Sequence, residues 1–553
     1  MGELGSFTRR TVLRSAAAAG AVTLLPAEVA RARAPQGVLA TRTLGTLVGT
    51  SPPVGAGRPF VLVGVQWSGP RGAALELRAL SSAGRWTPWV SAASLGHDPD
   101  GPARIGGLFG EPLWTGPAQA VQLRSAGPAR GVRLHFVSAR SSGPGSSPAA
   151  GASAAASPPL ALPVLDAGPG QPPIIARRGW AQGQARPGPF AGYGSVKLAF
   201  VHHTVNPNGY GPGQVPAMLR AIFDYHRYVR GYFDIAYNFL IDAYGRIWEG
   251  RAGGIDMAVV GAQAGGYNAE STGVALLGDF TSAVPSSAAL NALQNLLAWK
   301  LSLHGVPAHG RVTVVVDPAA AFYTPFAPGA HVSLPRVAGH RDGDLTDCPG
   351  NALYDRLPAI RGQVVALAGT PARITAGTAS TPVVAGTAAS ISGSLVLLNG
   401  SPLAGAPVEL QEVVSGVETT VARLTTGQDG SWNASLTLAQ NTLVRGLHRP
   451  APAAVSDWVE VLVAPAITLS VQSEPPLVVS GTVSPAKPHV VIELYNPQRP
   501  HKPVQRKRVR TSQGSFTATL RPPAPGSYWV IAKTLADAVN AAGASAAQVL
   551  TVG

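Results

Sequence analysis

The central third of this chain carries a hydrophobic pattern that restricts the fold more than any other feature. Residues 173–369 alternate strand-like and helix-like segments, beginning with the mostly apolar strand candidate Val196–His202. Gln214–Val229 and Ser286–His304 then place apolar residues on one helical face, on either side of the buried strand candidate Gly273–Gly278. This alternation predicts an α/β domain in which helices pack on a central mixed β-sheet.

Both flanks of the central domain are typical of β structure. Residues 35–140 hold short apolar or alternating runs between Gly and Pro, and residues 141–172 form a Ser/Ala/Gly/Pro linker. Residues 370–468 and 469–553 are similar to each other, since three short segments recur in the same order: Ser392-Gly393, Val408–Leu410 and Asp429–Leu436, then Ser480-Gly481, Ile492–Leu494 and Gln513–Leu520. We therefore expect an N-terminal β domain and two C-terminal Ig-like β-sandwich modules.

Four tryptophans of the N-terminal β domain allow two interpretations. Trp67, Trp86, Trp89 and Trp114 either line a glycan-binding face or pack in the core and at strand edges. Aromatic rings serve both purposes, and packing is the more common one. The sequence leaves this alternative open.

The first 34 residues have the pattern of an export signal. Arg9-Arg10 precedes the short apolar run Ala16–Leu25, and small residues alternate with Arg up to Ala34. Twin Arg before a short apolar segment predicts a Tat signal, with an ordinary Sec signal as the alternative. We expect a secreted, wall-associated protein without a stable membrane anchor, because the apolar run is too short to span a bilayer and no other segment is long enough.

The charge of the chain favours anionic partners. The net charge is +15, and removing residues 1–34, with five Arg and two Glu, lowers it by three. A basic exported protein is attracted to anionic cell-wall polymers. Nucleic acid is the competing partner, but the one dense basic run, Arg499–Arg510, is more typical of a solvated hairpin, so no nucleic-acid binding is expected.

Cys348 is the only cysteine of the chain and cannot form an intramolecular disulfide. It lies in the run Gly339–Gly350, eight positions after His340, with carboxylates and a threonine in between. By itself, a single cysteine is more often a small apolar filler than a metal ligand. The histidine and the carboxylates nearby make a metal site a hypothesis worth testing.

A series of motifs in the central domain resembles the peptidoglycan recognition protein family and its type 2 N-acetylmuramoyl-L-alanine amidase relatives. The motifs occur in the family's order over about a third of the chain: Ile174–Trp180, Val201–Thr204, Tyr225–Arg227, Asp234–Ile241, Gly245–Arg251, Val260–Gln263, Gly266–Asn268, Ser271–Val274, Leu277–Phe280, Gly339–Asp342 and Thr346–Gly350. An ordered set of this kind is highly specific.

The resemblance implies a zinc site and a reaction. It assigns the zinc ligands to His202, His340 and Cys348, and catalytic roles to Tyr237 and, with less support, Thr346. Three protein ligands leave the fourth zinc position for water or substrate. The implied substrate is peptidoglycan, as muramyl peptide, cleaved between the lactyl group of muramic acid and L-alanine. The stem-peptide type cannot be transferred, because Ala252–Ile255 departs from the family pattern after Gly250-Arg251.

Other roles for these residues fit less well. A structural zinc site requires a fourth ligand, and there is no second cysteine. A catalytic thiol leaves His202 without a role. His203 is expected on the opposite face of its strand, in the core or the cleft wall. Two rival functions stay open: a peptidoglycan-binding protein without activity, although such relatives commonly have Ser in place of the cysteine, and a wall scaffold built on the β modules.

Overall fold

The computed structural model describes residues 34–69, 74–92, 106–139, 170–188, 192–379, 381–414, 417–521 and 524–552. The predicted export signal lies outside the described residues except for Ala34, and so does most of the predicted linker. The described chain up to Pro371 forms one compact unit, which holds the N-terminal β domain and the central domain, and most of the chain from Ala372 onward forms a second. Among the described residues, no helix combines the length and apolarity needed to cross a membrane.

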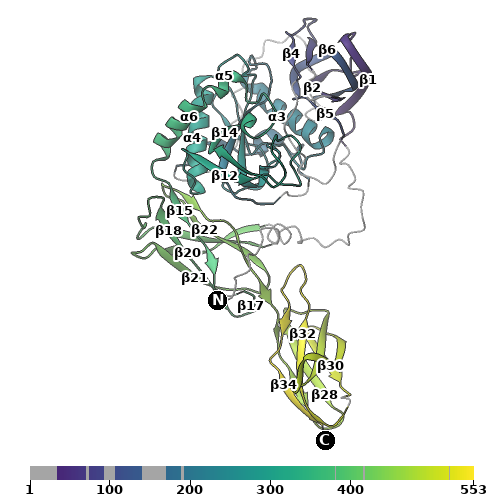
Figure 1. Ribbon diagram of the computed structural model, residues 1–553, viewed down its shortest axis with the longest axis vertical. Helices are drawn as coiled ribbons and strands as arrows, with labels where there is room; N and C mark the ends of the chain where they lie inside the picture. Colours follow the sequence, from purple (N-terminus) through teal and green to yellow (C-terminus); the bar gives the residue numbers. More distant parts are fainter. Residues whose placement is uncertain are drawn as a thin grey trace. The chain divides into compact units, whose positions relative to one another are not determined.

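The N-terminal domain, purple in Figure 1, is a single six-stranded sheet. Its strands are β1 (Leu39–Thr50), β2 (Phe60–Ser68), β3 (Leu75–Ser81), β4 (Val90–Ser91), β5 (Leu108–Phe109) and β6 (Leu113–Val137), in the order β4-β3-β6-β2-β5 with β1 paired to β6. Trp67 and Trp114 are buried, whereas Trp86 and Trp89 are half-buried and stack against the Arg78 guanidinium. The four tryptophans therefore do not form one glycan-binding face.

The central domain is built on the mixed sheet β14-β8-β11-β9-β10-β7. The middle strands β8 (Leu198–His203) and β11 (Ser271–Leu276) are parallel and completely buried, as is β14 (Val337–Gly339) beside β8. The remaining strands are β9 (Phe239–Ile241), β10 (Ile247–Glu249) and β7 (Ile174–Ile175). This is the predicted α/β domain with a mixed sheet.

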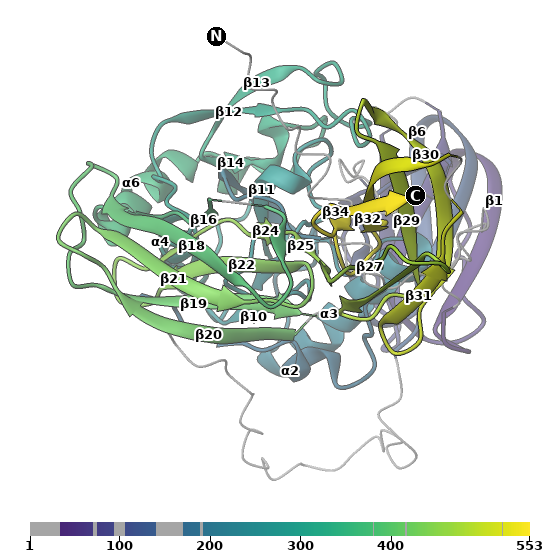
Figure 2. The same cartoon turned by 90° about the horizontal axis from the view of Figure 1, so that it is seen from below.

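Helices cover both faces of this sheet (Figures 1 and 2). α3 (Val215–Asp224), which continues as a π-helical turn over Tyr225–Val229, lies on one side, and α4 (Ser287–Leu303) and α6 (Leu357–Ala368) lie on the other. Ser286 caps α4, since its hydroxyl accepts a hydrogen bond from the Ala289 N–H at 3.1 Å. Short helices α2 (Arg178–Ala181) and α5 (Asn351–Tyr354), and the hairpin of β12 (Arg311–Val315) and β13 (His331–Pro335), complete the domain.

The C-terminal unit places the repeated sequence segments at equivalent positions. Gly393 of β18 (Ala388–Leu397) lies against Trp432 of β21 (Ser431–Thr437), and Gly481 of β28 (Val478–Ser484) lies against Phe516 of β31 (Ser515–Thr519). A Cβ on either glycine would lie within 2.7 Å of the aromatic ring. Both sites therefore need glycine for the same reason, which supports a duplicated module.

The strands of these two β domains form several small sheets. The first domain has β15 (Ala372–Ile374), β16 (Gly377–Thr378), β17 (Val383–Val384), β18, β19 (Pro407–Val414), β20 (Val417–Thr425), β21, β22 (Thr442–His448), β23 (Ala454–Val455), β24 (Val459–Val461) and β25 (Val463–Ala464). The second has β26 (Ala466–Ile467), β27 (Ser470–Gln472), β28, β29 (His489–Asn496), β30 (Arg499–Arg510), β31, β32 (Gly526–Thr534), β33 (Gly543–Ala544) and β34 (Gln548–Val552).

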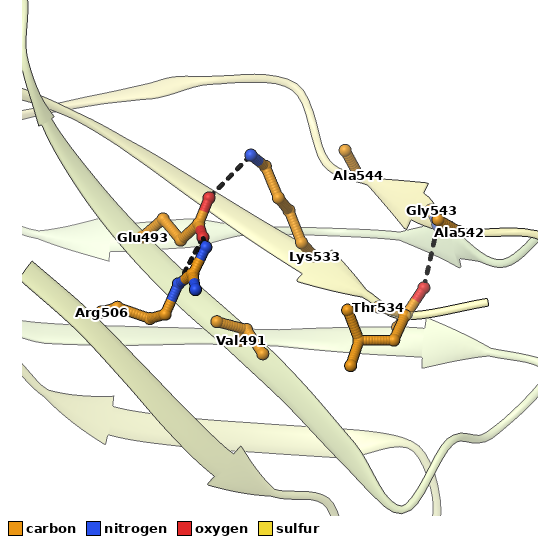
Figure 3. A pocket seen from close by; sticks show the side chains of 9 residues that line it. Val491, Glu493, Arg506, Lys533, Thr534, Ala542, Gly543 and Ala544 are labelled. Atoms are coloured by element: carbon orange, nitrogen blue, oxygen red, sulfur yellow. Dashed lines mark hydrogen bonds and ion pairs between the residues drawn. The ribbon is translucent and has the colours of Figure 1, made fainter. Parts of the chain in front are cut away.

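The basic run Arg499–Arg510 is strand β30, the hairpin partner of β29. Glu493 of β29 lines a pocket of the second β domain. Its carboxylate lies between Lys533 Nζ at 2.6 Å and Arg506 Nε at 2.7 Å (Figure 3). These charges satisfy one another, so the pocket offers no unpaired carboxylate to a ligand.

Candidate metal and catalytic site

Strand β8 delivers the first candidate ligand from the centre of the sheet. His202 and His203 are its last two residues, and successive side chains of a strand point to opposite faces. His203 Nδ1 accepts a hydrogen bond from the Phe280 N–H at 3.2 Å and lies 3.9 Å from a carboxylate oxygen of Asp279. The His203 side chain therefore packs on one face of strand β8, and the His202 side chain points to the opposite face, where it can act as a metal ligand.

The loop after β14 delivers the other two candidate ligands. His340 opens a 3₁₀ turn over His340–Asp342, directly after the strand that pairs with β8. The Arg341 N–H donates to the Cys348 carbonyl at 3.0 Å, and the Arg341 guanidinium donates to Asn351 at 2.7 Å. These bonds close the loop and bring Cys348 back beside the end of β8, where its Sγ accepts from the His203 N–H at 3.4 Å.

The ligand atoms of His202, His340 and Cys348 all lie within 4.8 Å of one another, and all three residues are buried. The two imidazole rings have centroids 4.5 Å apart, and Cys348 Sγ lies 3.7 Å from His202 Nδ1. Two imidazoles and one thiolate form a donor set that suits zinc, with one position left open. The residues present therefore fit the predicted metal.

Burial sets the protonation of this cluster. It lowers the pKa of His202 well below its usual range, an effect that the neighbouring His340 reinforces, so His202 is neutral, as a metal ligand must be. Burial also raises the pKa of the Cys348 thiol well above its usual range, and the charge of Glu111 adds to this effect. The thiol must therefore release its proton when a metal binds.

Asp344 lies beside His340, and the sequence motifs assigned it no role at the site. Asp344 Oδ2 lies 3.0 Å from His340 Nε2 and accepts from the Gly265 N–H at 2.8 Å. With the proton on Nε2, His340 presents Nδ1 to a metal. Asp342 accepts from the Gly339 N–H and the Tyr354 hydroxyl, so it braces the loop without reaching a ligand.

Tyr237 lies beside the cluster, and Thr346 lies in the loop that carries Cys348. The Tyr237 ring is 5.3 Å from the His202 ring, and only 1% of the residue is exposed. Burial raises the pKa of Tyr237 well above its usual range, so its hydroxyl keeps its proton. The Thr346 hydroxyl accepts from the Cys348 N–H at 3.2 Å and thus closes the ligand turn.

Comparison with known proteins agrees with this geometry. Residues 192–351 match a family model described as N-acetylmuramoyl-L-alanine amidase, and residues 25–158 match one described as Rv3811 N-terminal galactose-binding domain-like. The fold and the His/His/Cys cluster define the class as an α/β domain of the amidase type. The central domain belongs to the peptidoglycan recognition protein and type 2 N-acetylmuramoyl-L-alanine amidase family, as its motifs predicted.

The similarity to individual relatives is confined to part of each chain. Peptidoglycan-recognition protein 1 of Holotrichia diomphalia is 33% identical over 134 residues, which are 24% of this chain and 64% of the relative. The N-acetylmuramoyl-L-alanine amidase of Homo sapiens is 30% identical over 193 residues, 34% of this chain and 28% of the relative. This chain thus spans less than two thirds of either protein. Among solved structures, wild-type Drosophila PGRP-LB is 26% identical and aligns over 34% of this chain and 92% of its own, with a TM-score of 0.26.

Proposed function

We propose that this protein is an exported, zinc-dependent N-acetylmuramoyl-L-alanine amidase. Its substrate is peptidoglycan, and the bond cleaved is the amide between the lactyl group of muramic acid and the L-alanine of the stem peptide. The observation that carries the proposal is the convergence of His202, His340 and Cys348 within 4.8 Å, beside the Tyr237 ring. Membership of the central domain in a family that includes amidases supports the same reaction.

Each residue of the site has a separate role in amide hydrolysis. A zinc ion held by the three ligands would supply a positive centre that polarises the carbonyl and acidifies water. Asp344 holds the His340 ring in the orientation that presents Nδ1. Tyr237 keeps its phenolic proton and donates it in a hydrogen bond to the oxygen that becomes negative in the tetrahedral intermediate. Thr346 accepts a backbone N–H, and its own O–H stays available for a second such bond.

Recognition of peptidoglycan without cleavage is the second candidate function. The related Holotrichia protein is named for recognition, whereas the related human protein is named as an amidase. Cys348 favours cleavage, because a cysteine in the ligand position supplies the thiolate that a catalytic zinc site needs. A scaffold role of the β modules would add to either function.

The test is hydrolysis of a soluble muramyl peptide by the purified full chain. We expect free stem peptide, detected by mass spectrometry, with the zinc-loaded protein and none after chelation. Cys348→Ser should lose zinc and activity while keeping the thermal unfolding profile of the metal-free protein. If the zinc-loaded protein binds cell wall but releases no free stem peptide, the amidase proposal is wrong and recognition is the remaining function.

Export through the Tat pathway and Ig-like spacer modules complete the proposal. The twin Arg9-Arg10 before a short apolar run supports the first, and the glycine–aromatic contacts repeated in both C-terminal domains support two related β modules. Fusion of residues 1–34 to a reporter that is exported only when folded tests the signal. Replacement of both arginines by lysine should block that export; unchanged export would exclude the Tat pathway.

A further inference from the structure

The second C-terminal β domain has one sheet face that points away from its core. Alternate residues of a strand lie on opposite faces, and the even-numbered residues of β29 belong to the hydrophobic core. The residues on the other face, which we call the outer face, include Glu493 and Tyr495 of β29, Arg508 and Arg510 of β30, and Trp529 and Lys533 of β32.

The outer face is positively charged. The Glu493 carboxylate is shared by Arg506 and Lys533, so two cations surround one carboxylate. Arg508 and Arg510 are exposed, and neither pairs with a carboxylate in the described part of the chain. Arg508 lies 3.2 Å from His489 Nδ1, which does not neutralise it. The outer face is therefore suited to an anion.

Exposed apolar side chains lie beside these cations. Trp529 pairs with Tyr495 of β29 on one side and with Val549 of β34 on the other. Trp529 is 38% exposed and Val549 is 59% exposed. Lys533 Nζ lies 5.3 Å from the Tyr495 ring, so the cationic and aromatic parts of the face adjoin. An exposed apolar patch bordered by polar residues is typical of an interaction site.

A pocket of about 400 Å³ opens on the same face (Figure 3). Glu493, Arg506 and Lys533 line it together with the exposed side chain of Leu535. Its volume lies within the range of small-molecule sites, about 300–1,000 Å³. The outer face therefore has a hollow in which part of a larger ligand fits.

The first C-terminal β domain has the same arrangement of charges around a carboxylate. Glu409 of β19 lies opposite Arg423 of β20, in the register that Glu493 and Arg506 have in the second domain. Glu409 forms ion pairs with Arg423 at 3.7 Å and with Arg449 at 3.1 Å. Because both domains contain this cluster, it belongs to the module itself and does not indicate a ligand.

The two domains differ at the positions that make the outer face distinctive. By strand register, Arg445 of the first domain is the counterpart of Trp529. Arg445 is buried, with its guanidinium 4.8 Å from the Trp458 ring, so this position is covered in the first domain and exposed in the second. Thr425 is likewise the counterpart of Arg508. The module thus folds without an exposed Trp or an unpaired Arg at these positions.

We propose that the outer face of the second C-terminal β domain binds an anionic polysaccharide of the cell wall. The Trp529 ring stacks on the apolar face of a sugar residue, and the guanidinium groups of Arg508 and Arg510 donate hydrogen bonds to oxyanions along the polymer. Charge complementarity indicates an anionic partner. The choice of a wall polysaccharide rests on the proposed function, because an exported amidase acts within the wall.

The test measures binding of the full chain to carboxymethyl-dextran and to uncharged dextran by isothermal titration calorimetry. Neither polymer contains a muramyl peptide, so the amidase site does not take part. We expect binding to the charged polymer only, and weaker binding at high salt. Equal binding to both polymers, or none to the charged one, overturns the proposal. Tighter binding of a single-stranded oligonucleotide or of phosphatidylglycerol vesicles would also overturn it.

Paired charge variants locate the surface. Arg508→Gln/Arg510→Gln should weaken binding to carboxymethyl-dextran about 3- to 30-fold. The control Lys507→Gln/Arg423→Gln removes the same charge elsewhere: Lys507 pairs with the core residue Ile492 and points away from the outer face, and Arg423 belongs to the first domain. The control should bind nearly as the wild type. Equal weakening in both double variants would reduce the effect to net charge and overturn the assignment.

Trp529 variants test the aromatic contact. Trp529→Thr should weaken binding about 3- to 10-fold, whereas Trp529→Phe keeps a ring and should retain most of the affinity. Thermal unfolding verifies that both variants are folded, and unchanged affinity of folded Trp529→Thr excludes stacking. Turnover of a soluble muramyl peptide should be the same in all these variants. A protein that binds the charged polymer but cleaves no muramyl peptide contradicts the proposed function and leaves the binding surface in place.

Discussion

Asp344→Ala tests how the loop after β14 prepares His340 to bind a metal. The substitution removes the acceptor 3.0 Å from His340 Nε2 and the acceptor of the Gly265 N–H at 2.8 Å. Loss of a partner that orients a ligand imidazole weakens metal binding by about 10- to 100-fold, or about 1.4–2.7 kcal/mol. Because Asn still offers an oxygen to both groups, Asp344→Asn should weaken binding less.

The assay is competition for zinc between the full chain and a chromophoric chelator at neutral pH. Asp342→Asn is the matched control, since Asp342 lies in the same loop but bonds to Gly339 and Tyr354 instead of a ligand. Thermal unfolding in excess chelator shows whether a variant has lost its fold. If Asp344→Ala holds zinc as tightly as the wild type, or if Asp342→Asn loses as much affinity, Asp344 does not orient the ligand.

Zinc affinity should rise about tenfold per pH unit near neutrality, because burial raises the pKa of the Cys348 thiol and binding must displace its proton; a flat competition profile would contradict this. Tyr237→Phe should lower kcat about 10²- to 10³-fold at unchanged zinc content, measured on a muramyl peptide, and normal turnover would exclude it as an oxyanion donor. Gly64→Ala should lower the free energy of unfolding by about 1–3 kcal/mol, because the added Cβ meets the Tyr225 ring. Adding Tyr225→Leu to this variant should restore part of the lost stability in thermal unfolding. If the double variant is as unstable as Gly64→Ala alone, the clash is refuted.

The clustering of His202, His340 and Cys348 was predictable from the sequence, because these residues lie in short, ordered motifs that resemble those of a known family. The opposite faces of His202 and His203 follow from strand geometry alone, and the bond from the Phe280 N–H to His203 agrees with it. Asp344 was not predictable in this way. Whether Asp342 or Asp344 reaches His340 depends on the path of a 3₁₀ turn, and the hydrophobic pattern of the sequence does not predict that path.

The hydrophobic core that the N-terminal domain shares with the central domain was also missed, although β2 carried a signal for it. Phe60–Trp67 is buried along its whole length, as expected for a strand covered on both faces. One set of its residues, including Val63 and Trp67, packs in the core of its own domain, and Leu62 packs with the central domain. A continuous apolar run therefore predicts a second covered face, but the sequence does not say which part of the chain covers it.

The shared core has a consequence for how the central domain can be studied. The family match begins at residue 192, yet α3 of that domain buries Leu219 and Ile222 in the same cluster as Leu62 and Trp114. Each large apolar side chain that loses its cover costs about 1.5–3 kcal/mol. A chain of residues 170–371 should therefore unfold at lower temperature than residues 34–371 and expose apolar surface to a fluorescent dye. Equal melting temperatures and no dye binding would show that the central domain is independent of the N-terminal domain.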